Sequence, residues 1–205
     1  MDTDQSSVAE AQTVGASLHA CDQPHWQVRG KVEKYMAPSS AVRAGEVEPY
    51  EVVETTGNVL LRGGADLLWL GLISTAGVTA TTGVKNTAFN NANAAILVGD
   101  SNSAAVNTQV DLQASSASTD REVLQMEATY PLHSTGDGST GNLNVQFKGV
   151  ASTSMANFAW NEWGIGNSTS STAPFKGRLI NRKVQSLGTK STAATWAFTV
   201  TLSMA

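Results

Sequence analysis

Glu162 has the sequence surroundings most typical of a chemical site in this chain. It lies in "NFAWNEWGI", residues 157–165, where three aromatic rings accompany one carboxylate. As a regular strand, this segment would place Glu162 on the same face as Phe158 and Trp160. Burial in an apolar environment raises the pKa of an acid and prepares it for proton transfer. A buried structural ion pair would use the same kind of position, so the segment alone leaves both interpretations open.

The rest of the sequence favours the ion pair. A glycosidase would need a second carboxylate, and none is close to Glu162 in the sequence. Basic residues are concentrated downstream in a chain with 13 lysines and arginines: Lys176, Arg178, Arg182, Lys183 and Lys190. A guanidinium on the next strand would bind the carboxylate in a bidentate manner and offset the cost of its burial. We therefore predict a structural ion pair of Glu162 with Arg178 or Arg182.

A serine nucleophile is the second candidate. "VGDS", residues 98–101, resembles the strand-to-serine turn of GDS-type esterases, which also use a late histidine three residues after an aspartate. The histidines of this chain are His19, His25 and His133, and His133 has no aspartate three residues before it. A serine without a base is a weak nucleophile. We interpret the Gly-Asp-Ser sequence as a turn.

Metal and nucleotide sites are also poorly supported. The segment with His19, Cys21, Asp22 and His25 has ligand types for zinc, but the chain has a single cysteine and no second cysteine pair. "GDGSTGN", residues 136–142, lacks the ordered ligand spacing of a calcium loop. "RGGADLL" lacks the Lys-Ser/Thr pair that reaches a nucleotide phosphate. We therefore predict no cofactor and no metal.

Composition limits the classes of partner. Charged residues make up 15% of the chain, against roughly 25% in an ordinary domain, and the formal net charge is -4. These values argue against nucleic-acid binding, which needs a basic face. The most apolar window, at residues 65–74, is shorter than the roughly 20 residues of a membrane span. The start has no secretory signal pattern, and one cysteine fits synthesis in a reducing cytoplasm.

The first quarter of the chain divides into an arm and a hairpin. Residues 1–24 are small and polar without a clean period, which predicts an extended N-terminal arm. Residues 25–56 contain two alternating segments around the Pro- and Gly-containing stretch at residues 36–49. We expect a β-hairpin or linker here, with a loop at residues 36–49, ahead of the main domain.

The remainder, residues 57–205, is expected to form one β domain. A broad apolar stripe predicts a buried helix at about residues 58–73, with Asn58 as its cap. Short apolar or alternating segments separated by polar turns follow, including "AAILVGDS", "LNVQFKGVAST", "RLINRKVQS" and "TWAFTVTLSM". "DREVLQMEATYP" could be a strand or a short helix. The sequence thus predicts a mainly β protein, an antiparallel, jelly-roll-like β-sandwich with one buried helix and an extended arm.

Several blocks together carry a resemblance to a known class. They are "FNNANAAILVGDS", "TQVDLQAS", "ATYP", "ANFAWNEWGI", "LINRKVQSLGTK" and "ATWAFTVTLSM". In this order, and with "GNVLLRGGADLLWLGLI", the chain resembles a family of bacteriophage virion proteins over roughly residues 26–205. "NEWGI" followed by "LINRKV" also resembles the end of tail-fibre and virion-attachment domains. The resemblance implies a virion structural protein, made in the host cytoplasm, and leaves its place in the particle open.

Three functions follow as hypotheses. The first is a non-enzymatic capsid decoration or cement protein that binds the shell, and thus the major capsid protein, through its arm. The alternative is a tail, collar or fibre component with a carbohydrate-binding role at the host surface. The enzyme hypothesis is a polysaccharide hydrolase. An exposed pair among Trp26, Trp160, Trp163 and Trp196 would favour sugar binding, whereas burial of all four would favour a scaffold.

Self-association is the last expectation. The segment at residues 195–204 has no charge on either face, so it should be central in a sheet or covered by another copy. If Trp163 and Ile165 lie opposite Phe158 and Trp160, that strand has two apolar faces. We therefore predict a homo-oligomer, a trimer by the resemblance, with Trp163, Trp196 and Phe198 near the subunit contact.

Overall fold

The computed structural model describes residues 26–57, 59–61, 64, 89–115, 117–133, 144–167 and 179–204. Nine strands and one short helix lie within these residues. In chain order they are β1 (Trp26–Tyr35), α1 (Ser39–Ala44), β2 (Glu51–Thr56), β3 (Val59–Leu60), β4 (Ala95–Gly99), β5 (Arg121–Gln125), β6 (Asn144–Ala151), β7 (Ala159–Gly166), β8 (Asn181–Thr189) and β9 (Thr195–Met204). No helix among them is long and apolar enough to cross a membrane.

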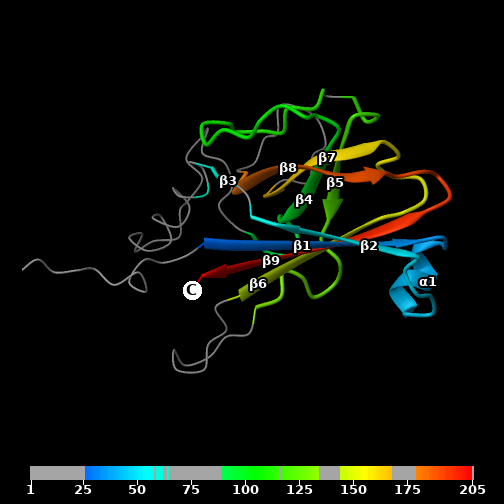
Figure 1. Cartoon of the computed structure of the whole chain (residues 1–205). Coiled ribbons are helices and arrows are strands. Elements are labelled where there is room, and N and C mark those ends of the chain that lie inside the picture. The colour runs from blue at the N-terminus through cyan, green and yellow to red at the C-terminus, as the bar shows by residue number, and fades with distance from the viewer. Residues whose placement is uncertain are drawn as a thin grey trace, which may run out of the picture.

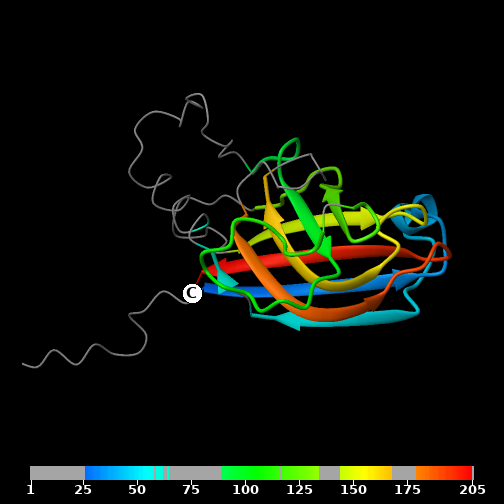
Figure 2. The same ribbon diagram turned by 90° about the horizontal axis from the view of Figure 1, so that it is seen from above.

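Two antiparallel sheets pack face to face (Figures 1 and 2). One has the strand order β2-β1-β9-β6, and the other has the order β3-β8-β7-β4-β5. Alternate apolar side chains of β1, β6 and β9 meet those of β4 and β7 in the main core. The predicted mainly β antiparallel sandwich is confirmed.

The five-stranded sheet is covered on both faces at β4. Ile96 and Val98 belong to the main core, whereas Ala95 and Leu97 belong to a second cluster that includes Leu112. Successive residues of a strand point to opposite faces. Leu112 therefore packs on the outer side of this sheet, which explains why the β4 sequence is continuously apolar.

β9 is central, and the first hairpin is part of the sandwich. β1 and β2 pair as predicted, but β1 also pairs with β9 along its whole length, from Trp26 opposite Met204 to Tyr35 opposite Thr195. The other side of β9 pairs with β6. We expected residues 25–56 to precede the main domain. They instead supply two of the four strands of one sheet, because β9 needs a partner on each side.

The helices differ from the sequence prediction. The stretch expected to be a loop at residues 36–49 contains α1, which follows Pro38 and ends at Gly45, with φ 71°. α1 lies at the end of the sandwich away from the C-terminus (Figure 1). The buried helix predicted at residues 58–73 falls mostly outside the described residues. Within it, Val59–Leu60 form β3, a strand on the edge of a sheet.

The alternation of β7 breaks at Asn161. Trp160 pairs with Gly188, but Glu162 pairs with Val184, so residues 185–187 of β8 lie opposite Asn161 alone. This β-bulge changes which side chains face inward. Both Trp160 and Trp163 lie in the main core, although they are three positions apart and regular alternation would place them on opposite faces.

The core contacts of β7 correct our assignment of its faces. The ring centroids of Trp160 and Trp196 are 4.8 Å apart, and those of Trp163 and Phe198 are 5.2 Å apart, both in edge-to-face geometry. We predicted that Glu162 shares a face with Trp160. It lies instead on the outer side of the five-stranded sheet.

The outer edges of the four-stranded sheet are occupied. At β2, Lys183 Nζ donates to Thr56 O (3.0 Å) and Gln185 Nε2 donates to Glu54 O (3.4 Å). At β6, backbone hydrogen bonds join Gln146 to Leu132 in both directions, and the N–H of Glu127 donates to Lys148 O. These contacts oppose the addition of another strand at either edge.

Candidate functional site

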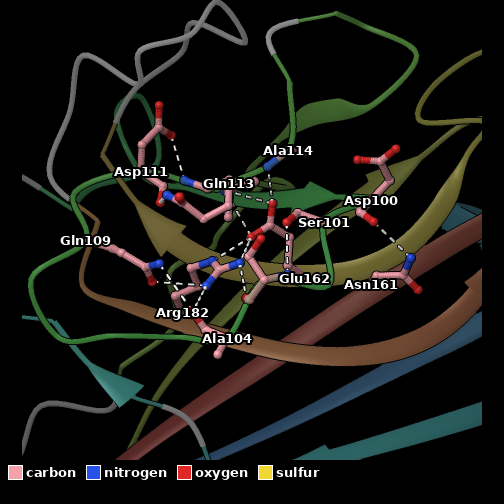
Figure 3. A network of polar contacts seen from close by, with 12 residues as sticks. Asp100, Ser101, Ala104, Gln109, Asp111, Gln113, Ala114, Asn161, Glu162 and Arg182 are labelled. Carbon is pink, nitrogen blue, oxygen red and sulfur yellow. Dashed lines mark hydrogen bonds and ion pairs between the residues drawn. The ribbon is translucent and has the colours of Figure 1, made fainter.

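Glu162 lies beneath the segment of residues 100–115, on the outer side of β7 (Figure 3). The segment follows β4, whose last residue, Gly99, pairs with Glu162. Neither Glu162 nor its partner Arg182 is exposed to solvent at all. The site is thus a buried polar network between a sheet and the loop that covers it.

The carboxylate of Glu162 is held from two directions. Arg182 Nε and Nη2 each lie 2.5 Å from Oε2. The backbone N–H of Ala114 donates to Oε1 (2.6 Å), and that of Gln113 donates to both oxygens (2.9 and 3.1 Å). The ion pair that we predicted with Arg182 is present, whereas Arg178 lies outside the described residues. Backbone donors from the loop complete the shell of the carboxylate.

The guanidinium of Arg182 uses its other donors on the same loop. Nη1 donates to Ala104 O (3.2 Å) and to Gln109 Oε1 (3.0 Å), and Nη2 donates to Ser103 O (2.9 Å). The ion pair therefore binds residues near both ends of the loop. Its buried charges are hydrogen-bonded throughout, which is the condition for burying them without a large cost.

A second buried ion pair lies at the far end of the loop. Arg121 of β5 contacts Asp111 through Nη2 and Oδ1 (2.5 Å) and through Nη1 and Oδ2 (3.3 Å), and the N–H of Leu112 donates to Oδ1 (2.8 Å). The sequence analysis missed this pair. Its signal was an acid between two apolar residues, Val110 and Leu112, in "TQVDLQAS".

Two aspartates beside the loop titrate differently. Burial raises the pKa of Asp100, and the nearby charge of Asp120 adds to the rise. Hydrogen bonds from Ser115 and Thr119 lower the pKa of Asp120. The hydroxyls of Ser115 and Thr119 are close to Asp120 in the sequence. These local contacts explain the lowered pKa of Asp120 without a role in acid-base chemistry.

The described residues do not form the esterase arrangement. The hydroxyl of Ser101 accepts the N–H of Ser103 (3.1 Å), which is a local turn contact. His133 Nδ1 lies 2.9 Å from Asn144 O, at the start of β6 in the other sheet. Gly99, two residues before Ser101, pairs with Arg121 at the start of β5, and His133 follows the other end of that strand. Within the part of the chain that the structure describes, the single histidine, His133, contacts Asn144 and not Ser101, whereas His19 and His25 lie outside that part.

The predicted subunit-contact residues lie inside the chain's own core. Trp163 and Phe198 are 0% exposed and Trp196 is 1% exposed. The bulge turns Trp163 inward, and the five-stranded sheet covers the inner face of β9, so our placement of these three residues at a subunit contact is wrong. Trp160 is also buried, and Trp26 packs partly against the same core. These four tryptophans provide no exposed pair for a sugar.

The metal candidates cannot be placed. His19, Cys21, Asp22 and His25 lie outside the described residues, as does the segment at residues 136–142. Within the part of the chain that the structure describes, no group of three or more His, Cys, Asp or Glu side chains could hold a metal ion.

No family model, no curated protein and no solved structure matches this chain.

The tight fit at Gly99 gives a first prediction. A Cβ on this residue would lie 2.7 Å from Glu162 Oε1 and 2.8 Å from Ala114 Cβ. Gly99→Ala should therefore lower the free energy of unfolding by about 2 kcal/mol, as overpacking typically does. Urea unfolding measures this change. Adding Ala114→Gly to the variant should recover part of the loss, and an unchanged stability of Gly99→Ala would contradict the close contact.

Proposed function

We propose that this protein is a non-enzymatic structural component of a bacteriophage virion, and specifically a capsid decoration protein. In this proposal the N-terminal arm binds the shell and the sandwich associates with further copies. The block resemblance described above supports the class. The order of the blocks, rather than any single one, is the basis for it.

The observation on which the proposal rests is that the carboxylate of Glu162 is fully buried. This carboxylate was the strongest candidate for an active-site acid, and it is fully buried with its lone pairs directed at Arg182 and two backbone N–H groups. A general acid must reach its substrate. Glu162 instead stabilises the conformation of the loop above it, which is a scaffold role.

A tail, collar or fibre component is the alternative within the virion. Its sugar-binding form would require exposed aromatic rings. Trp160, Trp163 and Trp196 are buried, while Tyr50 is exposed near α1. A single ring is a weaker platform than the exposed pair that we set as the criterion. Gold labelling of intact particles would distinguish the head from the tail.

The arm provides the direct test of attachment. Residues 1–24 have too few apolar side chains to build a core of their own, so an arm that becomes ordered must borrow the surface of a neighbour. Deleting residues 1–24 should leave a folded domain that no longer occupies particles. The full chain and the deletion variant would each be added to particles lacking the protein, and bound protein would be quantified by mass spectrometry after sedimentation.

Two controls make this test decisive. The thermal unfolding of the deletion variant should match that of the full chain, because β1 begins after the deleted segment. The full chain should occupy the particles. If the full chain does not bind, the decoration proposal fails, and if the deletion variant binds equally, the role of the arm fails.

A further inference from the structure

Two connections between the sheets lie at the end of the sandwich that carries α1 (Figures 1 and 2). The first, residues 152–158, joins β6 to β7, and the second, residues 190–194, joins β8 to β9. Each of them crosses from one sheet to the other. The strand ladders end before the connections, where Ala151 pairs with Trp196 and Ala159 pairs with Thr189. Contacts outside the ladders must therefore hold the two connections together.

Lys190 supplies the hydrogen bonds between the two connections. Its backbone N–H donates to Phe158 O (3.0 Å), and its Nζ donates to Ser152 O (2.6 Å) and Asn157 Oδ1 (2.8 Å). A longer bond from Nζ reaches Ser191 O (3.4 Å) within its own connection. Among the described residues, no hydrogen bond between the connections comes from another side chain or backbone group. One residue therefore ties both ends of the first connection to the second.

The amine of Lys190 is buried without a counter-charge. Lys190 is 1% exposed, and it is the one titratable residue in residues 152–158 and 190–194. On neighbouring strands, Lys34 and Glu51 pair with each other (2.9 Å). The other titratable side chains of the segments at this end of the sandwich are Tyr35, Arg43, Glu46, Glu48 and Glu127, and among the described residues none of them bonds to Lys190. Burial therefore lowers the pKa of the amine to about 8.

The connections bury little apolar surface of their own. Ala156, Phe158 and Ala194 belong to the main core, and the two alanine side chains are single methyl groups. The exposed residues are Ser154, Asn157, Ser191, Thr192 and Ala193. Segments with few buried apolar contacts open locally at a lower free energy than the whole fold. Releasing the contacts of Lys190 would thus free both connections and leave the ladders paired.

We propose that the two connections open together within the folded protein, and that the contacts of Lys190 hold them closed. Opening transfers the amine to water, where a lysine has its ordinary pKa of 10.5. Between pH 8 and pH 10.5 the open form therefore binds a proton that the closed form has released, so that rising pH favours the closed form. The open population should fall ~40-fold between pH 8 and pH 10. This inference does not depend on the proposed function.

Acetylation of amines in the full chain measures this opening. Acetic anhydride at a low extent of modification reacts with exposed neutral amines, and mass spectrometry gives the rate at each lysine. Each rate is divided by the rate of a free model lysine in the same solution, which removes the pH dependence of the reagent. The relative rate of Lys190 should fall ~40-fold between pH 8 and pH 10, whereas that of the exposed Lys31 should change far less.

Urea separates a local opening from global unfolding. The denaturant dependence of an opening reaction scales with the surface that it exposes. If the opening is local, about 1 M urea should change the relative rate of Lys190 less than ~2-fold. A route through global unfolding would instead raise this rate by the full denaturant dependence of the fold, which urea unfolding of the same protein measures.

Two variants test the contact of the amine itself. Asn157→Ala removes one acceptor of Lys190 Nζ and should raise the relative rate of Lys190 ~10-fold at pH 8. Thr192→Ala is the matched control, because Thr192 is exposed within the second connection. It should be acetylated at Lys190 like the wild type. Thermal unfolding would verify that each variant is folded.

Four results would overturn the inference. They are a relative rate of Lys190 equal to that of Lys31, a relative rate that does not change between pH 8 and pH 10, a urea dependence equal to that of global unfolding, and an Asn157→Ala variant that is acetylated like Thr192→Ala. The third result would show that the connections open only with the whole fold. The fourth would show that the contacts of the amine do not hold them closed.

Discussion

Replacing Glu162 with glutamine should lower the free energy of unfolding by about 3 kcal/mol. The variant leaves the guanidinium of Arg182 fully buried without its counter-charge, and loss of one partner of a buried ion pair typically costs about 3 to 5 kcal/mol. We expect the lower end, since the amide oxygen of glutamine still accepts hydrogen bonds from Arg182. Urea unfolding at neutral pH measures the change.

Two comparisons separate this effect from a general loss of charge. Glu54→Gln, at an exposed position on β2, should change stability by less than about 0.5 kcal/mol. Combining Glu162→Gln with Arg182→Gln should cost less than the sum of the single variants, since no lone charge remains. A loss below about 1 kcal/mol for Glu162→Gln would contradict the structural role. Ester or glycan hydrolysis by the wild type that this variant loses would contradict the non-enzymatic proposal.

The free energy of unfolding should increase as the pH rises above 8, because of the buried amine of Lys190. Its side chain is 1% exposed, and Nζ donates to Ser152 O (2.6 Å), Asn157 Oδ1 (2.8 Å) and Ser191 O (3.4 Å). Among the described residues no carboxylate pairs with it. Burial therefore lowers its pKa to about 8, because removal from water disfavours the ammonium form.

The sign of the effect follows from proton binding. Between pH 8 and the ordinary lysine pKa of 10.5, the unfolded chain holds a proton at Lys190 that the folded chain has released. Stability rises with pH wherever the unfolded state binds more protons. The free energy of unfolding should increase by about 3 kcal/mol across this window and stay constant with respect to this group below pH 8.

Lys190→Met isolates the contribution of this one amine. Tyrosines and other lysines titrate in the same range, but they do so in both proteins. The unfolding free energy of the wild type minus that of the variant should therefore become more positive between pH 7 and pH 10. A constant difference over that range would refute the lowered pKa of Lys190.

Most of the strands and half of the site could be predicted from the sequence. The period of two in "TWAFTVTLSM" and its lack of charge predicted a strand that is either central in a sheet or covered by another copy, and β9 has neighbours on both sides. The acid in an aromatic segment and the basic residues downstream predicted an ion pair of Glu162 with Arg178 or Arg182, and Arg182 is its partner in the structure. These features follow from side-chain types, which a sequence states directly.

The other half of the site depends on groups that every residue carries. The N–H groups of Gln113 and Ala114 and the carbonyls of Ser103 and Ala104 surround the ion pair, and no residue type marks them. The bulge at Asn161 was also hidden, because alternation was assumed to continue through "NFAWNEWGI". One break in register reversed the face of Glu162 and the environment of Trp163 together.

The occupied edges of the four-stranded sheet have a consequence for production of the protein. Under the proposed function the protein would accumulate in its host before assembly, and open strands at high concentration are a common start of insoluble aggregates. Lys183, Gln185 and the segment at residues 126–132 keep these two edges covered in the isolated chain. Variants that uncover an edge, such as Gln185→Val, should appear first as a loss of soluble yield, even where the melting temperature is unchanged.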